Sequence, residues 1–201
     1  MLTGLNITPE QLTEILRMFK VDMSEWGTPG HGTAQDLFSL IERGDAFLKI
    51  SNRGLALSTQ TARALIRNAQ GKVLVCGNKN RQGLDNSDLQ LGFSIPGGLI
   101  RGNSDARSTL ERELLEEAGF KAEEYVVGNC VTQEGKRAHG AQPNLPIERL
   151  DHIFTVQLVP CHPVLSVERF EHLDSQDGAL VFKWVPEEVW REKQRRKIHG
   201  N

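Results

Sequence analysis

One segment of the 201-residue sequence, from Gly97 to Phe120, constrains the fold more than any other. It reads GGLIRGNSDARSTLERELLEEAGF, and its second half carries apolar residues at helical spacing. We predict a helix from about Asp105 to Ala118. Gly119 stands where helices commonly end in a left-handed residue, and Phe120 resumes the apolar pattern. The segment therefore specifies a helix with a defined end and one face directed towards a core.

Three glutamates, Glu113, Glu116 and Glu117, occupy the last turns of this predicted helix, beside its apolar stripe. Like charges at this spacing repel by about 0.2–0.5 kcal/mol per pair, and negative charge at a helix C-terminus is unfavourable. Arg112 can reach Glu116 one turn away, but one guanidinium does not balance three carboxylates. A magnesium ion does, because it binds carboxylates together with water and phosphate oxygens. A solvated acidic face is the alternative for these glutamates taken alone.

The spacing around the glutamates resembles the Nudix box. The box pattern is G-x5-E-x7-R-E-U-x-E-E-x-G-U, where U is an aliphatic or bulky apolar residue. Eight of its nine defined positions match, and the matching residues are Gly98, Arg112, Glu113, Leu114, Glu116, Glu117, Gly119 and Phe120. Ser104 stands at the ninth position, where the family has its first glutamate. Strands before the box and a closing strand and helix extend the likeness over about residues 61–197.

The resemblance implies an α+β fold, a Nudix-like α/β/α sandwich with a mixed β-sheet, over residues 61–201. The residues of that region themselves predict a helix after Pro186 and strands at 62–68, 72–78, 93–98, 124–132, 150–159 and 179–185. Residues 1–60 lie outside the likeness. We expect them to form a small N-terminal lobe with helices at 8–20 and 34–43 and a hairpin at 46–58. This accessory lobe is expected to be either a dimer element or a substrate-side element.

The resemblance also implies an activity, the hydrolysis of a pyrophosphate bond in a nucleoside diphosphate linked to another moiety. Nudix enzymes use one or more Mg²⁺ or Mn²⁺ ions for this reaction. Position by position, the likeness implies that Glu116 and Glu117 are metal ligands and that Glu113 is a ligand or positions the attacking water. Arg112 would orient the glutamates, and the carbonyl of Gly97 would complete the ligand set.

Ser104 departs from the family pattern, because a serine cannot supply the charge of the missing glutamate. We expect it to be the N-cap of the helix, a position that serine favours. Losing one outer carboxylate is expected to weaken metal binding or rate without abolishing the site, because three glutamates remain. The alternative is a catalytically weak or inactive Nudix domain that acts as a nucleotide-sensing or protein-interaction module.

Two predicted loops carry further candidates. Residues 137–146, RAHGAQPNLP, are rich in turn formers and suited to close over a substrate, and Arg137 and His139 are candidates for binding its phosphates. Residues 160–178 are predicted to be a second loop. Its leading candidates for an extra base or metal ligand are Glu168 and Glu171, because a carboxylate can join a metal shell. Weaker candidates in or near these loops are Glu134, His162, His172 and Asp174.

The identity of the substrate stays open at this level. ADP-ribose-like and nucleotide-sugar substrates are favoured by the length of the chain beyond a minimal domain. A modified nucleoside triphosphate and a dinucleotide are the alternatives. In Nudix enzymes that act on ADP-ribose, a proline is expected about fifteen residues after the box, and Glu134 occupies that position here.

Composition disfavours other classes of partner. The formal net charge of −2 supplies no broad basic field, so nucleic-acid binding is not expected. No stretch reaches the roughly 18 apolar residues of a membrane span. The three cysteines are spaced too widely for a metal knuckle, and their odd number fits a reduced protein. We expect a cytoplasmic protein with a small-molecule nucleotide substrate, with a homodimer left open.

Overall fold

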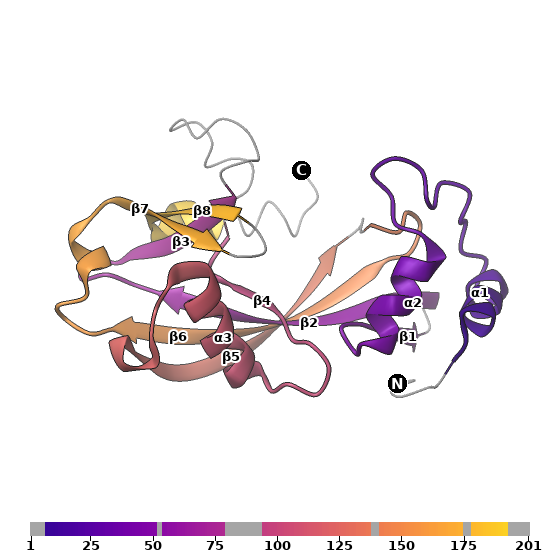
Figure 1. Ribbon diagram of the computed structural model, residues 1–201, viewed down its shortest axis with the longest axis horizontal. Helices are drawn as coiled ribbons and strands as arrows, with labels where there is room; N and C mark the ends of the chain where they lie inside the picture. Colours follow the sequence, from indigo (N-terminus) through magenta and orange to yellow (C-terminus); the bar gives the residue numbers. More distant parts are fainter. Residues whose placement is uncertain (1–6, 52–53, 79–93, 138–140, 175–177, 193–201) are drawn as a thin grey trace. The chain divides into compact units, whose positions relative to one another are not determined.

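The computed structural model describes residues 7–51, 54–78, 94–137, 141–174 and 178–192 (Figure 1). The elements are, in chain order, α1 (Pro9–Met18), α2 (Ala34–Glu42), β1 (Phe47–Ser51), β2 (Gly54–Ile66), β3 (Lys72–Asn78), β4 (Gly97–Leu99), α3 (Ala106–Ala118), η2 (Ala122–Glu124), β5 (Tyr125–Arg137), β6 (Ile147–Leu158), η3 (Pro163–Ser166), β7 (Arg169–Asp174) and β8 (Gly178–Pro186). Residues 187–192 are helical, as predicted for the segment after Pro186. Within these described residues, no helix combines the length and the apolar character needed to cross a membrane.

The strands form two sheets. The larger one has the order β1-β2-β6-β5, with β4 paired to β2, and the smaller one has the order β3-β8-β7. β1 runs antiparallel to β2, and β8 runs antiparallel to both of its neighbours. The arrows in Figure 1 show β2 and β6 running in the same direction and β5 in the opposite one. The predicted α+β class with a mixed sheet is therefore confirmed.

The chain divides into two compact units, and each is built from three separate stretches of sequence. The first unit consists of Met1–Thr61, Leu99–Asp105 and Gln133–Asp151, and the second of Ala62–Gly98, Ala106–Thr132 and His152–Asn201. β2, β5 and β6 contribute residues to both units. The boundary predicted between residues 60 and 61 therefore falls inside the continuous strand β2.

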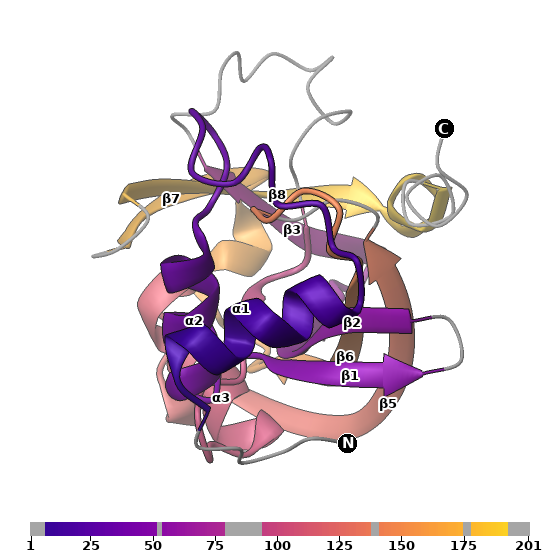
Figure 2. The same cartoon turned by 90° about the vertical axis from the view of Figure 1, so that its right-hand side faces the viewer.

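Two short helices and a hairpin form most of the first unit (Figure 2). Thr8 and Gln11 form a capping box at the start of α1, and Thr33 and Asp36 form another at the start of α2. Both helices begin within one residue of their predicted starts, and each threonine side chain accepts a hydrogen bond from a backbone N–H of the first turn. Their apolar faces pack on a core of buried leucines and one alanine: Leu12, Leu16, Leu37, Ala46, Leu48, Leu55, Leu57 and Leu145.

The connection from β5 to β6 is anchored in this first unit along residues 141–146. The N–H of Gly32 donates to the carbonyl of Ala141 at 2.6 Å, and the indole N–H of Trp26 donates to the carbonyl of Pro143 at 2.8 Å. Leu145 is buried in the leucine core, with 1% of its surface exposed. The predicted loop is present, but the expectation that it closes over a substrate does not fit residues 141–146, because hydrogen bonds and core packing hold them in place.

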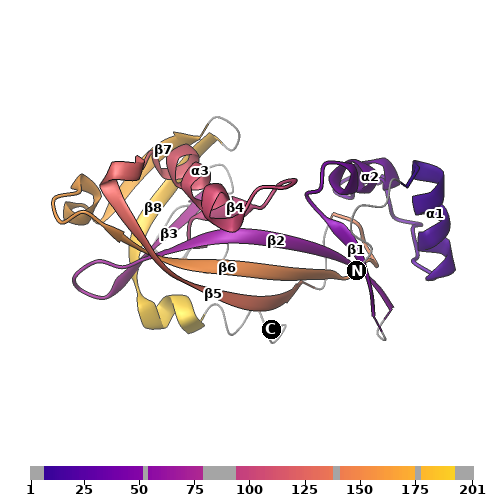
Figure 3. The same cartoon turned by 90° about the horizontal axis from the view of Figure 1, so that it is seen from below.

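The second unit places helices on both faces of its strands. Figure 3 shows α3 on one side of β2, β6 and β5, and the short helix 187–192 on the other side, as the predicted sandwich requires. Alternate residues of β2, namely Ala62, Ala64 and Ile66, are fully buried. A second apolar cluster, Val73, Val75, Ile95 and Val185, packs against Trp190 of the short helix.

Residues 160–178 are not the loop that was predicted. They contain η3 and the strand β7, which pairs antiparallel with β8. Phe170 of β7 stacks on Phe182 of β8 with ring centroids 4.7 Å apart. The residues on either side of Phe170 are exposed, so β7 has the alternation of a half-buried strand. The charged residues Arg169 and Glu171 concealed this pattern, because they occupy exposed positions of the strand.

Candidate active site at the helix α3

Helix α3 ends as its sequence predicts. Gly119 has a φ of +71°, a left-handed conformation that favours glycine, and its N–H donates to the carbonyl of Leu115 at 3.1 Å. Leu110 and Leu114 are fully buried, so the predicted apolar face is the face that packs. This packing fixes the rotation of the helix and therefore the direction of its glutamates.

The start of α3 differs from the prediction. The helix begins at Ala106, so Asp105 directly precedes it and Ser104 lies one residue further out. The N–H of Ser104 donates to the carbonyl of Arg101 at 3.1 Å, which closes a turn before the helix begins. Ser104 is exposed. The predicted N-cap position is therefore wrong by one residue, because the turn from Arg101 to Ser104 precedes the helix.

Arg112 joins two of the three glutamates. Its Nη2 lies 2.5 Å from Glu113 Oε1, and its Nη1 lies 2.6 Å from Glu116 Oε2. Burial of the Arg112 guanidinium acts to lower its pKa, but the charges and hydrogen bonds of Glu113 and Glu116 outweigh burial and raise the pKa above its ordinary value. Arg112 is thus a permanent cation that holds both carboxylates in place.

The third glutamate, Glu117, is held by the strand β4. The N–H of Gly97 donates to Glu117 Oε2 at 2.9 Å. The next residue, Gly98, faces the carboxyl group of Glu113 so closely that a Cβ at this position would overlap it. Gly98 therefore lets β4 approach the carboxyl group of Glu113, whereas a Cβ on Gly97 would overlap the backbone of β2 at Ala62. This is the physical reason for the Gly-Gly pair at the entry of the segment.

The box residues predicted to act on a metal lie on α3 and β4, where Arg112 and the Gly97 N–H contact their carboxylates. Glu113 is buried, with 8% of its surface exposed, whereas Glu116 and Glu117 are half-buried. Within the described part of the chain, no set of three or more His, Cys, Asp or Glu side chains is already grouped as a metal site. In this arrangement Glu113 and Glu116 contact Arg112, whereas Glu117 contacts the N–H of Gly97. The three carboxylates therefore do not share one partner.

The other predicted site residues are not part of α3 or β4. Glu168 is exposed, and Glu171 is exposed beside Arg169, 3.2 Å from its guanidinium. Glu134 is exposed on β5. Arg137 is the last residue of β5, and its side chain is not among the described parts. His139 lies outside the described residues, as does the side chain of Asp174.

One histidine of β7 contacts the end of α3. A Cβ on Gly119 would lie 2.8 Å from Cε1 of His172, so the ring packs directly on this glycine. His162 is buried instead against Phe120, with ring centroids 4.9 Å apart. The contact of His172 was not predicted, because residues 160–178 were expected to form a loop. The alternation of Arg169, Phe170 and Glu171 is the short signal that the strand leaves in the sequence.

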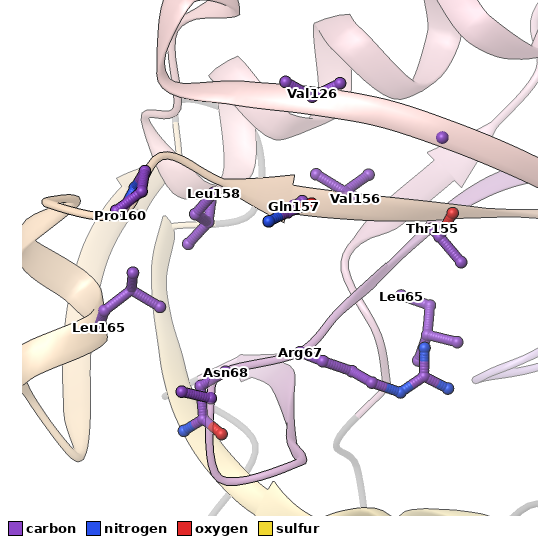
Figure 4. Close-up of a pocket in the computed structure, with 12 residues that line it drawn as sticks. Leu65, Arg67, Asn68, Val126, Thr155, Val156, Gln157, Leu158, Pro160 and Leu165 are labelled. Atoms are coloured by element: carbon purple, nitrogen blue, oxygen red, sulfur yellow. The ribbon is translucent and has the colours of Figure 1, made fainter.

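A separate pocket of about 570 Å³ lies in the second unit, at the ends of β2 and β6 (Figure 4). Aliphatic side chains such as Leu65, Val156 and Leu158 line it together with Arg67. Arg67 is held by Glu187, with Nε and Nη2 each within 2.9 Å of a carboxylate oxygen. None of the box residues lines this pocket. The lining is mainly apolar, and the charge of Arg67 is balanced by Glu187. The pocket is therefore not suited to bind a pyrophosphate.

Comparisons with known proteins agree with the resemblance of this segment to the Nudix box. A sequence model of the NUDIX domain matches residues 57–199 of this chain. A search of curated proteins finds no match. Among solved structures, a NUDIX hydrolase from Nitrosomonas europaea has 19% identity and a TM-score of 0.44, covering 69% of this chain and 78% of that one.

Two further structures have similar scores. An Ap4A hydrolase from C. elegans has 16% identity and a TM-score of 0.41, covering 72% of this chain and 88% of that one. A MutT protein from Methanosarcina mazei Go1 has 18% identity and a TM-score of 0.41, covering 72% and 95%. These values are too low to support an argument about substrate. The family match spans more than half of the chain, and the chain therefore belongs to the Nudix family of pyrophosphohydrolases.

Proposed function

We propose that this protein hydrolyses the pyrophosphate bond of a nucleoside diphosphate linked to another moiety, at the glutamates of α3. The observation that carries the proposal is the contact set around these glutamates. Arg112 holds Glu113 and Glu116, the Gly97 N–H holds Glu117, and Gly98 leaves room for the Glu113 carboxyl. A solvated acidic helix face does not need a buried glutamate fitted against a glycine.

The donor set fits Mg²⁺ or Mn²⁺. Three carboxylates and the nearby backbone of Gly97 offer hard oxygen ligands, which both ions prefer. Glu113, Glu116, Glu117 and the Gly97 carbonyl would hold the ion. When bound, the ion would neutralise phosphate charge and supply an activated water. Arg112 contacts Oε2 of Glu116, and a carboxylate has a second oxygen that can bind an ion.

The residues of the chain have distinct parts in this proposal. Glu113 is fixed on two sides, by Arg112 and by the backbone of Gly98, and so it can hold a water or an ion at a defined point. Arg112 orients Glu113 and Glu116 and takes no part in proton transfer, because its guanidinium stays protonated. Gly97 positions Glu117 through its N–H.

We propose an ADP-ribose-like compound or a nucleotide sugar as the substrate. The support is the length of the chain beyond a minimal Nudix domain. Arg137 and His139 are proposed to bind its phosphates, and Glu168 or Glu171 to act as an extra base or ligand. The position of Glu171 beside Arg169 on an exposed strand gives the last assignment the weakest support.

The test is a panel of nucleoside diphosphate derivatives incubated with Mg²⁺, with the nucleotide products measured. Glu116→Gln and Glu117→Gln are each expected to lower kcat/KM by about 100-fold or more, because each removes a ligand charge while keeping its shape. Glu111→Gln is the matched control, since Glu111 lies on the same helix and pairs with exposed Arg107. It should leave turnover unchanged.

The rival function is a catalytically weak domain that senses a nucleotide or binds a protein. The exposed Ser104 favours it, because the fourth carboxylate of the family pattern is absent. Turnover that survives both glutamine substitutions, or the absence of turnover with every compound in the panel, would establish the rival.

A further inference from the structure

The pocket of about 570 Å³ in the second unit lies on the face of the larger sheet opposite α3. Arg67 lines the pocket and reaches Glu187 of the helix 187–192, which lies on that face (Figures 3 and 4). Leu65 precedes Arg67 by two residues and therefore projects to the same side of β2. Among the described lining residues, none belongs to the box, so a ligand here would be separate from the proposed reaction.

One wall of this pocket carries no side chain at Gly128 of β5. A Cβ on Gly128 would lie 2.7 Å from Oγ1 of Thr155 on β6, so the two strands approach closely at this point. Val126 also lines the pocket, and it lies two residues before Gly128 on the same side of β5. Val126 is 66% exposed. This wall is therefore an open apolar surface that a flat ligand can contact.

The charge of the lining is balanced. The one charged residue among the described lining residues is Arg67, and it makes two hydrogen bonds to Glu187. The hydrogen bond from Arg67 lowers the pKa of Glu187 to about 2, so this carboxylate is ionised at neutral pH and neutralises the guanidinium. A charged ligand would enter a mainly apolar pocket without a counter-charge, which is unfavourable. The lining therefore favours an uncharged ligand.

Two side-chain amides also line the pocket, Asn68 after β2 and Gln157 on β6 (Figure 4). Oδ1 of Asn68 accepts hydrogen bonds from the N–H groups of Gln70 and Lys72, at 3.1 and 2.9 Å. These bonds fix the amide, and its NH₂ group is the part that can donate to a ligand. Gln157 is exposed and offers both a donor and an acceptor. The two amides suit a ligand edge that carries a donor beside an acceptor.

We propose that this pocket binds an uncharged purine base, with adenine as the preferred base. The aliphatic lining and the open wall at Gly128 suit the flat faces of such a ring. Amide side chains recognise adenine through its N7 acceptor and its N6 donor, which Asn68 and Gln157 can pair with. The volume lies within the roughly 300–1,000 Å³ of small-molecule sites. This site goes beyond the proposed function and does not depend on it.

A titration with adenosine at pH 7 without Mg²⁺ tests the proposal, followed by amide shifts in ¹H–¹⁵N spectra. Adenosine should shift the signals of Gly128 and Gln157 in a saturable way. In Gln157→Ala the Kd should rise by about threefold to tenfold, because one neutral hydrogen bond is lost. Val126→Asp puts a charge in the apolar lining and should raise the Kd by about tenfold or more. Val131→Asp is the matched control, since Val131 is 64% exposed on the same strand and is not among the lining residues.

The site is overturned if Gly128 and Gln157 show no saturable shift up to about 5 mM adenosine. It is also overturned if Val126→Asp and Val131→Asp have the same Kd, or if the shifts are confined to α3 and β4. Equal affinity for adenosine and uridine would contradict the preference for a purine. Thermal unfolding shows whether each variant is folded. Glu117→Gln should keep the adenosine shifts while it lowers turnover, so this site and the proposed hydrolysis can fail separately.

Discussion

At the scale of single residues, the site depends on small differences in shape and charge. Glu113 is buried because Arg112 supplies its counter-charge and Gly98 supplies space. Both features follow from the sequence, since a glycine and an arginine stand at the box positions. The position of Ser104 did not follow, because the turn from Arg101 to Ser104 moves the start of α3 by one residue.

Ser104→Glu tests whether the missing carboxylate limits metal binding. A glutamate adds a negative charge close to the start of α3, and the positive end of the helix dipole stabilises a negative charge there. We expect the Mg²⁺ concentration for half-maximal activity to fall by about threefold to tenfold, and the measurement is a metal titration of the initial rate. Ser104→Gln has the same length without the charge and should leave the requirement unchanged. An unchanged or higher requirement in Ser104→Glu would show that the serine site is already adapted.

At the scale of elements, the predicted bounds of a helix were correct where a strong local sequence signal marks its first or last residue. α1 and α2 begin within one residue of their predicted starts, and Gly119 marked the end of α3. β7 was missed because its interior carries two charged residues and a histidine, and only the pairing with β8 makes this composition stable as a strand. A propensity argument does not include that pairing.

The helix 187–192 is attached to β2 by an ion pair that should depend on pH. The hydrogen bond from Arg67, against the opposing effect of burial and aided by Arg191, lowers the pKa of Glu187 from 4.5 to about 2. A lowered carboxyl pKa adds stability that is present above pH 4.5 and is lost as the pH falls towards 2. Because the Arg67 side chain is 36% exposed, water screens the pair and we expect a contribution on the order of 1 kcal/mol.

Urea unfolding of Glu187→Gln measures this contribution. The variant should be less stable than the unmodified protein at pH 6, and the difference should shrink as the pH falls from about 4.5 towards 2. Glu111→Gln removes an exposed partner of Arg107 and serves as the control. A difference that is the same at pH 6 and at pH 2.5 would contradict the assignment.

At the scale of the whole molecule, sequence reasoning reached the family but not the composition of the two units. The N-terminal helices and hairpin were expected to form a lobe from residues 1–60. Their core includes Leu145, which comes from the connection between β5 and β6. Such a contact joins residues more than a hundred positions apart, and local patterns of sequence do not report it. We therefore propose that residues 1–60 complete their core only with residues 133–151.

Leu145→Ala tests this dependence. Leu145 is 1% exposed, so its truncation should leave a cavity and lower the free energy of unfolding by about 2–4 kcal/mol. Amide exchange should rise in α1 and α2, whose side chains share the same core. Leu173→Ala is the control, because Leu173 is 79% exposed and should tolerate truncation. Unchanged exchange in α1 and α2 would show that the N-terminal helices are stable without this residue.

The pairing of Arg112 with Glu113 and Glu116 has a consequence for the empty protein. Two of the three acidic groups already have a partner of opposite charge, so their mutual repulsion is largely cancelled before any ion arrives. We therefore expect the chain to fold without a metal ion, and we expect the ion that the proposed reaction uses to be needed for turnover.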